Sequence, residues 1–366
     1  MVRLLNDFTR VCKTEKGKEF CSCDFRINIY ECQLSEFYVI VGKILVAICL
    51  IDTVIAIGSM IYLTKVKKQP FFLSATRERG WLRPRPLHSY HLIVFFFMFF
   101  EAIHLIALIY ELYPNIVTAE VGNITKNTLT AAFAIFYTVS IVYSTPNVQF
   151  NDNYELSSRK NGPNTRLVDI IGIILFLQPI ITWFPLAILT GRFAEMNDIE
   201  TANFYFKLHY LAFVVWEIIY LMVLAYFYYK LMIVIRSYVK ILEERYSSLG
   251  TIDNGHLENI KKGSRNIKIP VMAVVNGLLF QAIVYFILSF TPRTTTIYYF
   301  GWNIFFIWTE YIAFPLIAFS IESFLLYHTL KNLKKSPNSS RKSSAPSSSS
   351  EQTQVNSDDD RNKLNR

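Results

Sequence analysis

Seven long apolar blocks, separated by polar and charged segments, dominate the pattern of the chain. They span about 38–64, 90–113, 128–145, 168–190, 208–235, 269–291 and 297–327. An α-helix needs roughly 20 apolar residues to cross the hydrocarbon core of a bilayer, and all seven blocks are near or above that length. They are too long and too continuously apolar for the alternating strands of a membrane barrel. The pattern therefore predicts an all-α membrane protein, a bundle of seven transmembrane helices.

The basic stretch Lys65–Arg85, between the first two blocks, sets the predicted orientation. It contains seven Lys or Arg residues and one acid, Glu78. Short loops this rich in Lys and Arg stay on the cytoplasmic side of the membrane. The N-terminus is then outside and the C-terminus cytoplasmic, and the remaining inner loops, which are net basic, fit the same arrangement.

Three regions follow from this topology. Residues 1–37 form an extracellular segment, residues 38–330 the seven-helix domain, and residues 331–366 a Ser-rich cytoplasmic tail that is too polar to form a core and is expected to be disordered. No apolar stretch precedes the first block, so we expect the first span to act as a signal anchor. The net charge of +9 comes from basic residues beside the spans. It therefore indicates contact with a lipid bilayer and not with nucleic acid.

Four of the five cysteines lie in the N-terminal segment, at Cys12, Cys21, Cys23 and Cys32. In an oxidising compartment, four cysteines allow three pairings into two disulfides. A Cys12–Cys32 bridge with one of the inner pair left over is as plausible as two bridges. A metal site is the rival interpretation, although Cys-Ser-Cys lacks the usual zinc-finger spacing.

A glycosylation acceptor pattern, Asn123-Ile-Thr125, falls in the segment Glu111–Asn127 between the second and third blocks. The charge pattern places this segment outside the membrane, as an extracellular loop. We therefore predict a glycan on Asn123.

Seven spans, an external N-terminus, a basic third inner loop and a Ser-rich tail together resemble a G-protein-coupled receptor. The resemblance covers residues 38–335 and rests on topology more than on motifs. The third span ends in Tyr143-Ser-Thr-Pro146, where rhodopsin-like receptors have Asp-Arg-Tyr, and the last span has Phe314-Pro315-Leu-Ile-Ala in place of Asn-Pro-x-x-Tyr. The chain is most similar to a divergent lineage, such as fungal or nematode chemosensory-type receptors.

Four acidic residues lie well inside the predicted spans: Asp52, Glu101, Glu217 and Glu310. A charge at mid-membrane costs about 2.5–3.5 kcal/mol even on the more lenient scale, so these side chains should face the bundle interior. His104, three residues after Glu101, shares a helix face with it and is its expected basic partner. These residues either line a polar cavity for a ligand, cation or proton, or form hydrogen bonds that hold the helices together.

Aromatic residues accompany two of these acids. Tyr210 and Phe213 precede Glu217 on the fifth span, and Trp302 and Phe306 precede Glu310 on the seventh. They are candidates for the wall of a ligand pocket, while belts at the lipid interface and bundle core are the commoner uses of such residues. The eight candidates for ligand binding are thus Glu101, His104, Glu217, Glu310, Tyr210, Phe213, Trp302 and Phe306.

Basic residues of the inner loops are the candidates that the resemblance assigns to contact with a G protein. They are Arg159, Lys160, Arg236, Lys240, Lys261, Lys262 and Arg265. Ser343 and Ser344 follow Arg341-Lys342 in the tail and are candidate phosphorylation sites, because phosphate there would reverse the local charge.

The resemblance implies a cell-surface receptor, in the plasma membrane, that senses an extracellular ligand in the outer half of the bundle and signals through a heterotrimeric G protein. The alternative is a transporter or channel that uses the mid-membrane acids to couple protons or cations. The sequence lacks His-Glu-x-x-His, Gly-x-Ser-x-Gly and a phosphate-binding Gly-rich loop, so neither an enzyme nor a cofactor is expected.

Overall fold

The computed structural model describes residues 4–15, 17–72, 85–144, 148–150, 156–158, 165–249 and 254–334. The chain divides into two units, Met1–Leu326 and Tyr327–Arg366. The second unit is described only as far as residue 334, the end of the last helix. The predicted phosphorylation sites Ser343 and Ser344, and the basic residues Arg159 and Lys160, lie outside the described residues.

The described chain is mostly helical. Its helices are α1 (Ser35–Ile61), α2 (Pro86–Ile109), α3 (Ile116–Ser144), α4 (Thr165–Glu195), α5 (Ile199–Leu249), α6 (Asn254–Phe290), α7 (Arg293–Tyr298), α8 (Phe300–Ile307) and α9 (Phe314–Lys334). Two π-helical turns, η1 (Tyr62–Val66) and η2 (Trp308–Ala313), continue α1 and join α8 to α9. Two antiparallel hairpins complete it: β1 (Arg10–Glu15) with β2 (Lys18–Cys23), and β3 (Val148–Phe150) with β4 (Leu156–Ser158).

Five of these helical segments are long and apolar enough to cross a membrane. They are Ser35–Val66, Leu87–Ile109, Asp169–Glu195, Ile199–Ser237 and Phe300–Tyr327. Their outward-facing side chains are apolar, as at Val54 and Ile181, which are each 70% exposed. A soluble protein would hide such residues, whereas a bilayer solvates them. The apolar helices thus confirm a membrane protein.

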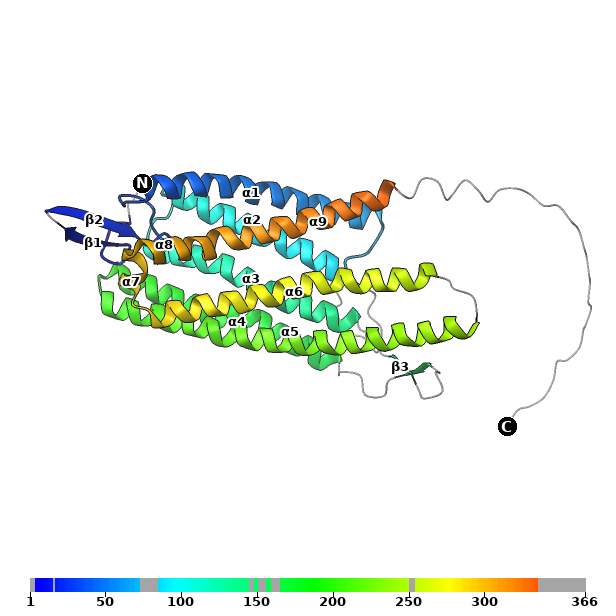
Figure 1. Cartoon of the computed structure of the whole chain (residues 1–366). Helices are drawn as coiled ribbons and strands as arrows, with labels where there is room; N and C mark the ends of the chain where they lie inside the picture. Colours follow the sequence, from blue (N-terminus) through cyan, green and yellow to red (C-terminus); the bar gives the residue numbers. More distant parts are fainter. Residues whose placement is uncertain are drawn as a thin grey trace, which may run out of the picture. The chain divides into compact units, whose positions relative to one another are not determined.

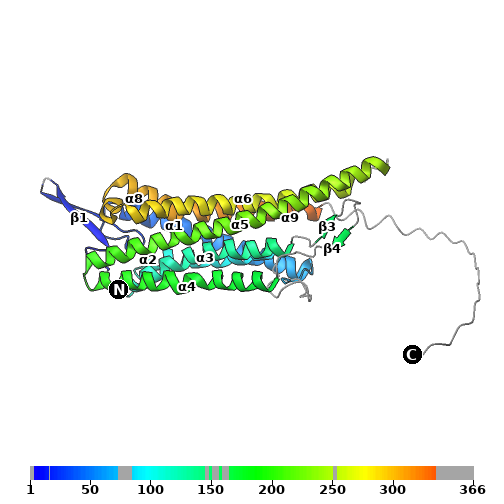
Figure 2. The same ribbon diagram turned by 90° about the horizontal axis from the view of Figure 1, so that it is seen from below.

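The helices lie side by side along a common direction (Figures 1 and 2). α1 packs on α2, α2 on α3, α3 on α4 and α5, and α5 on α6. Interior packing is aromatic: the buried Trp183 ring on α4 stacks on Phe213 of α5, with ring centroids 3.8 Å apart. The β1–β2 hairpin lies at the end of the bundle where α7 and α8 begin (Figure 1).

The prediction of a loop at Glu111–Asn127 is wrong for most of this segment, because the helix α3 already begins at Ile116. Asn115 starts this helix as an N-cap: its side-chain Oδ1 accepts a hydrogen bond from the Thr118 backbone N–H at 2.9 Å. The segment looked like a loop because it carries Glu120 and Lys126. In the structure both side chains are 1% exposed and have charged partners inside the bundle.

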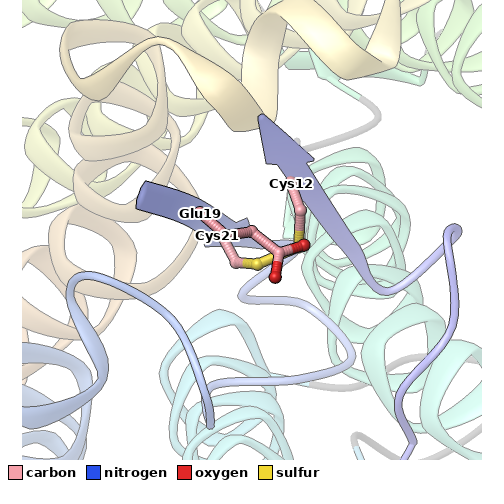
Figure 3. A group of neighbouring side chains, drawn as sticks. All are labelled: Cys12, Glu19 and Cys21. Atoms are coloured by element: carbon pink, nitrogen blue, oxygen red, sulfur yellow. A yellow bond between two sulfur atoms is a disulfide. The ribbon is translucent and has the colours of Figure 1, made fainter. Parts of the chain in front are cut away.

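The N-terminal cysteines form two disulfides, Cys12–Cys21 and Cys23–Cys32. Cys12 and Cys21 lie directly opposite each other in the β1–β2 ladder, so the hairpin register sets this pairing. The alternative of a Cys12–Cys32 bridge is therefore wrong. Glu19 lies beside Cys12 and Cys21 in a group with the spacing of a metal site (Figure 3). Because both sulfurs are engaged in the disulfide, neither is a free thiolate to bind a metal.

We expect two cross-linked peptides in a non-reducing digest, one joining Cys12 to Cys21 and one joining Cys23 to Cys32. The remaining cysteine, Cys49, is buried and unpaired. Denatured, unreduced protein should therefore react with one equivalent of a maleimide, and reduced protein with five, since the chain has five cysteines. Mass spectrometry of the alkylated protein measures both values. A peptide joining Cys12 to Cys32 would contradict the structure.

Candidate functional site

The N-terminal segment inserts into one end of the helix bundle. We call its described residues, 4–15 and 17–34, the N-terminal plug, and the end that they occupy the plugged end. Phe8, Thr9 and every residue from Cys23 to Ile29 are buried. The Phe25 ring lies edge-on against Tyr311, with centroids 5.3 Å apart, and the side-chain amide of Asn303 donates to the Cys23 carbonyl at 3.2 Å. The plug therefore reaches the interior of the bundle.

An ion cluster holds the plug in place. The Asp24 carboxylate accepts hydrogen bonds from Arg26 Nε (2.9 Å) and Arg26 Nη2 (2.5 Å) on the plug, and from Arg293 Nη2 (2.6 Å) and Nε (3.1 Å) on α7. All three side chains are at most 4% exposed. Two guanidinium forks on one carboxylate make charge-assisted bonds that fix both position and orientation. Asp24 thus joins two segments that are 269 residues apart in the sequence.

Arg26 extends this cluster to two more helices. Its Nη1 donates to the Tyr210 hydroxyl of α5 at 2.9 Å and lies 3.6 Å from Glu120 Oε2 of α3. Its guanidinium carbon sits 4.5 Å from the centroid of the Phe206 ring, a cation–π contact. We call Asp24, Arg26, Glu120, Arg293 and Tyr210 the plug cluster. Its two acids and two arginines balance, which makes their burial tolerable.

The pKa of the Asp24 carboxyl reflects two opposing effects. Burial raises it, but the charges and hydrogen bonds of Arg26 and Arg293 outweigh burial and hold the pKa below the usual range of an aspartate. Burial also lowers the pKa of Arg293, although the nearby Asp24 opposes this shift. Because a guanidinium does not deprotonate in proteins, the cluster remains ionised on both sides.

A second cluster, deeper in the bundle, surrounds Lys126 of α3. The Lys126 ammonium lies 3.5 Å from Glu101 Oε2 of α2, donates to the Glu310 backbone carbonyl at 3.2 Å, and sits 3.3 Å from the centroid of the Tyr311 ring. We call Lys126, Glu101, Glu310, Tyr311 and His104 the lysine cluster. All five residues are at most 6% exposed. One cation therefore connects α2, α3 and the π turn η2.

The π turn explains why the Glu310 carbonyl is available to Lys126. In a π turn the carbonyl of residue i accepts from the N–H of residue i+5. Five residues after Glu310 is Pro315, which has no N–H to donate. The proline therefore cannot donate to this oxygen in the π register, and the lysine donates a hydrogen bond to it.

His104 links the lysine cluster to the start of α3. Its Nδ1 is 2.6 Å from the Tyr113 hydroxyl, its Nε2 is 3.0 Å from the Tyr311 hydroxyl, and the Tyr311 hydroxyl donates to Asn123 Oδ1 at 3.3 Å. Gly122 permits this approach: a Cβ there would lie 2.1 Å from the Tyr113 hydroxyl oxygen and 3.0 Å from His104 Nδ1. Tyrosine and histidine contacts thus continue the polar interior towards the plugged end.

The structure brings together part of the predicted ligand-binding set. Glu101, His104 and Glu310 meet in the lysine cluster, and Tyr210 belongs to the plug cluster. Glu217, 2% exposed, interacts electrostatically with Glu310 across the interior. Phe213 and Phe306 are buried and pack in the hydrophobic core of the bundle. The indole of Trp302 is 38% exposed and stacks on Phe306, on the rim of the structure.

The expected pairing of Glu101 with His104 is wrong, because Lys126 is the basic partner of Glu101. Sequence reasoning missed Lys126 by assigning it to a loop. It also missed Asp24 and Arg26, since a segment without helical or strand periodicity gives no sign of burial. The sequence signal that could have identified Lys126 is Asn115, a residue type that favours the N-cap of a helix. A helix that begins there, as α3 does, places Lys126 ten residues inside it.

A third buried polar group lies away from the plugged end. His91 Nδ1 on α2 is 2.7 Å from Glu322 Oε1 on α9, and the buried Asp52 of α1 interacts electrostatically with Glu322. Neither oxygen of Asp52 has a hydrogen-bond partner within the described chain. Asp52 is thus inside the bundle, as its sequence position indicated, but it does not belong to either of the other clusters.

Of the predicted coupling residues, Arg236 and Lys240 are exposed on α5, where Lys240 pairs with Glu244 four residues on at 3.8 Å. Lys261, Lys262 and Arg265 lie on the first half of α6. The end of α5 and the start of α6 lie away from the plugged end (Figure 1).

No protein-family model matches the chain, and neither a curated protein nor a solved structure is similar enough to match it. The inferences below therefore depend on the geometry of this structure.

The charges of the two clusters at the plugged end do not balance. Their acids are Asp24, Glu120, Glu101 and Glu310, against Arg26, Arg293 and Lys126, so the described acids exceed the bases by one, and Glu217 adds another. An uncompensated buried carboxylate is costly. The interior therefore favours uptake of a proton or a small cation near Glu310 and Glu217.

Asp24→Asn should destabilise the protein by about 3–5 kcal/mol, the cost of removing one partner from a buried ion pair, because Arg26 and Arg293 lose their shared carboxylate. The folded-state pKa of Asp24 lies below its unfolded value of about 3.9. The stabilisation by Asp24 is thus complete when the pH is above the unfolded-state pKa, and it is lost as the pH falls through the folded-state pKa. Thermal unfolding in detergent, followed from pH 7 to pH 3, measures the difference between wild type and variant.

Asp7→Asn is the matched control, because Asp7 lies on the same segment but is exposed. It should leave the unfolding temperature unchanged. Equal effects of the two substitutions, or a difference that grows on acidification, would contradict the role of Asp24.

The burial of Asn123 speaks against the glycan predicted there. Its side chain is 1% exposed within α3, and its Oδ1 accepts from Tyr311. A glycan needs an exposed loop. We expect no change in electrophoretic mobility when protein from a eukaryotic host is treated with an N-glycosidase, and Asn123→Gln should migrate like wild type. A glycosidase-sensitive shift lost in Asn123→Gln would overturn this helix register.

Proposed function

We propose that the protein is a seven-span cell-surface receptor in which the N-terminal plug forms the outer part of the ligand-responsive site, and which signals through a heterotrimeric G protein. The observation that carries this proposal is the contact between the plug and the bundle interior. Phe25 of the plug touches Tyr311, whose ring also receives the Lys126 ammonium. A ligand that shifts the plug would therefore act directly on the lysine cluster.

Two further helices support a count of seven spans. α3 has 29 residues, or about 44 Å at 1.5 Å per residue, and its charged residues Glu120 and Lys126 point inward. α6 has a shorter apolar stretch, Val274–Phe290, at the end of a 37-residue helix. Together with the five apolar helices they give seven, with the plug outside and the basic stretch Lys65–Arg85 inside.

The lengths of α5 and α6 support a cytoplasmic partner. α5 has 51 residues, or about 77 Å, well over twice the roughly 30 Å of hydrocarbon. The end of α5 and the start of α6 extend beyond the other helices (Figure 1). Arg236 and Lys240, in the second half of α5, are exposed, and exposed basic residues suit an acidic protein surface.

The π turn η2 is the element that we expect to change between states. π turns are often found at functional sites, and η2 lies where α8 meets α9. The Lys126–Glu310 hydrogen bond holds this turn. A ligand that favours another position of the plug would shift the population towards a different arrangement of η2 and α9.

A second function, coupling of protons or cations in a transporter or channel, is favoured by one observation, the excess of buried acids around Glu310 and Glu217. It predicts ion movement in place of G-protein activation. The experiment below separates the two functions.

Co-expression with a panel of Gα subunits, read by subunit dissociation with and without crude ligand mixtures, tests the receptor. Lys126→Met and removal of residues 240–262 should each abolish the response, because the first breaks the interior contact and the second the coupling surface. Glu200→Gln, an exposed change at the start of α5, should leave it intact. Surface expression is measured for every variant.

Silence of the whole panel, with the protein shown at the cell surface, would contradict the receptor. A pH-dependent current or uptake that is abolished by Glu101→Gln and Glu310→Gln would then establish the second function.

A further inference from the structure

An apolar cavity lies below the lysine cluster, away from the plugged end. Its volume is about 100 Å³, and it lies between α6 and α9 with α2 and α3 behind it. Val94, Leu278, Phe314, Ala318 and Ile321 contribute to its wall, and none of its lining residues is charged. An engineered apolar cavity of about 150 Å³ stays dry and binds benzene, so a space of this size suits a hydrocarbon group more than water.

The cavity is one helical turn from the lysine cluster. Thr130 in its wall follows Lys126 by four residues, and Phe314 follows Glu310 by four. The Thr130 hydroxyl donates to backbone carbonyls of its own helix, and the Gln281 amide donates to the Tyr285 hydroxyl at 2.7 Å. The polar atoms at this boundary therefore already have partners, and the cavity offers an occupant chiefly apolar contact.

The cavity opens towards lipid. Ile317 lines it and is also 48% exposed on the outside of the bundle. On α6, Val274 and Gly277 line the cavity and are only half-buried. Both flanking segments, Val274–Phe290 and Phe300–Tyr327, are apolar membrane-type helix. The entrance between α6 and α9 therefore faces the hydrocarbon of the bilayer.

The opposite route into the bundle is occupied by the protein itself. Buried residues of the plug occupy the plugged end of the bundle, and the plug cluster connects the plug to α3, α5 and α7. A water-soluble molecule that entered from the plugged end would have to displace the plug and then pass the lysine cluster to reach the cavity. The bilayer reaches the cavity from the side.

We propose that this cavity binds the end of one acyl chain of a bilayer phospholipid, inserted sideways between α6 and α9. Acyl chain ends gather near the bilayer midplane, and Phe314 in the wall of the cavity is at the middle of the apolar segment Phe300–Tyr327. The volume admits one chain and not two. An inserted chain fills the space beneath the lysine cluster, so lipid occupancy favours the present spacing of α6 and α9. The proposal requires a membrane protein but not signalling through a G protein.

Gly277 provides the means to test it. A Cβ added there meets only the Phe314 ring, at an ordinary 3.8 Å, so a larger side chain would extend into the cavity. Gly277→Leu should fill the space that the acyl chain occupies. Gly58→Leu is a matched control on α1, because Gly58 is exposed and a Cβ there meets nothing within 4 Å. Both changes bring the same gain in helix propensity.

The experiment uses the full chain in phosphatidylcholine nanodiscs that contain a phosphatidylcholine with a diazirine near the end of one acyl chain. After illumination, adducts are mapped by mass spectrometry. We expect them to concentrate in 274–281 of α6 and 314–321 of α9. Gly277→Leu, and independently Ala318→Leu, should reduce these adducts several-fold, while Gly58→Leu should not.

Adducts spread over all lipid-facing helices, or unchanged by either filling substitution in protein with a wild-type unfolding temperature, would overturn the proposal. A parallel sample with a free diazirine fatty acid distinguishes the source of the chain. Stronger labelling by the free acid that is lost in Gly277→Leu would show that the site takes free fatty acids and not phospholipid, which also contradicts the proposal as stated.

Discussion

The carboxylate of Asp24, held by Arg26 and Arg293, is the contact on which the plugged end depends. Without it, two guanidinium groups would remain buried with only Glu120 to compensate them. Such a charge group is costly unless each member has partners. Displacement of the plug would leave the Asp24–Arg26 pair intact within the plug, but it would break the contacts with Arg293, Glu120 and Tyr210 together.

Deeper in the bundle, one proline has an effect on a different helix. Pro315 cannot donate to the Glu310 carbonyl in the π register, and a lysine on α3 donates to that oxygen while pairing with Glu101 on α2. The irregular turn η2 and the buried lysine therefore stabilise each other. The plug touches the same Tyr311 ring that packs over the lysine, so the two ion clusters are adjacent parts of one polar interior.

The apolar blocks predicted a membrane protein of long helices, because the cost of exposing polar backbone to lipid leaves few alternatives. The cost of burying charge likewise placed Glu101, Glu217 and Glu310 inside. Lys126 and Asp24 were not predicted to be buried, because a charged residue in a polar segment is normally solvated. Their burial is tolerated only because the fold brings partners of opposite charge to them. The disulfide pairing stayed open until the β1–β2 register placed Cys12 opposite Cys21.

The contact between Asp24 and Arg293 also orders the events of biogenesis. Asp24 leaves the ribosome 269 residues before Arg293. During synthesis Asp24 therefore has only Arg26 of its own segment as a charged partner until α1 to α6 have been made. Seating of the plug is thus a late step, because the second arginine that binds Asp24 becomes available only when α7 has been made.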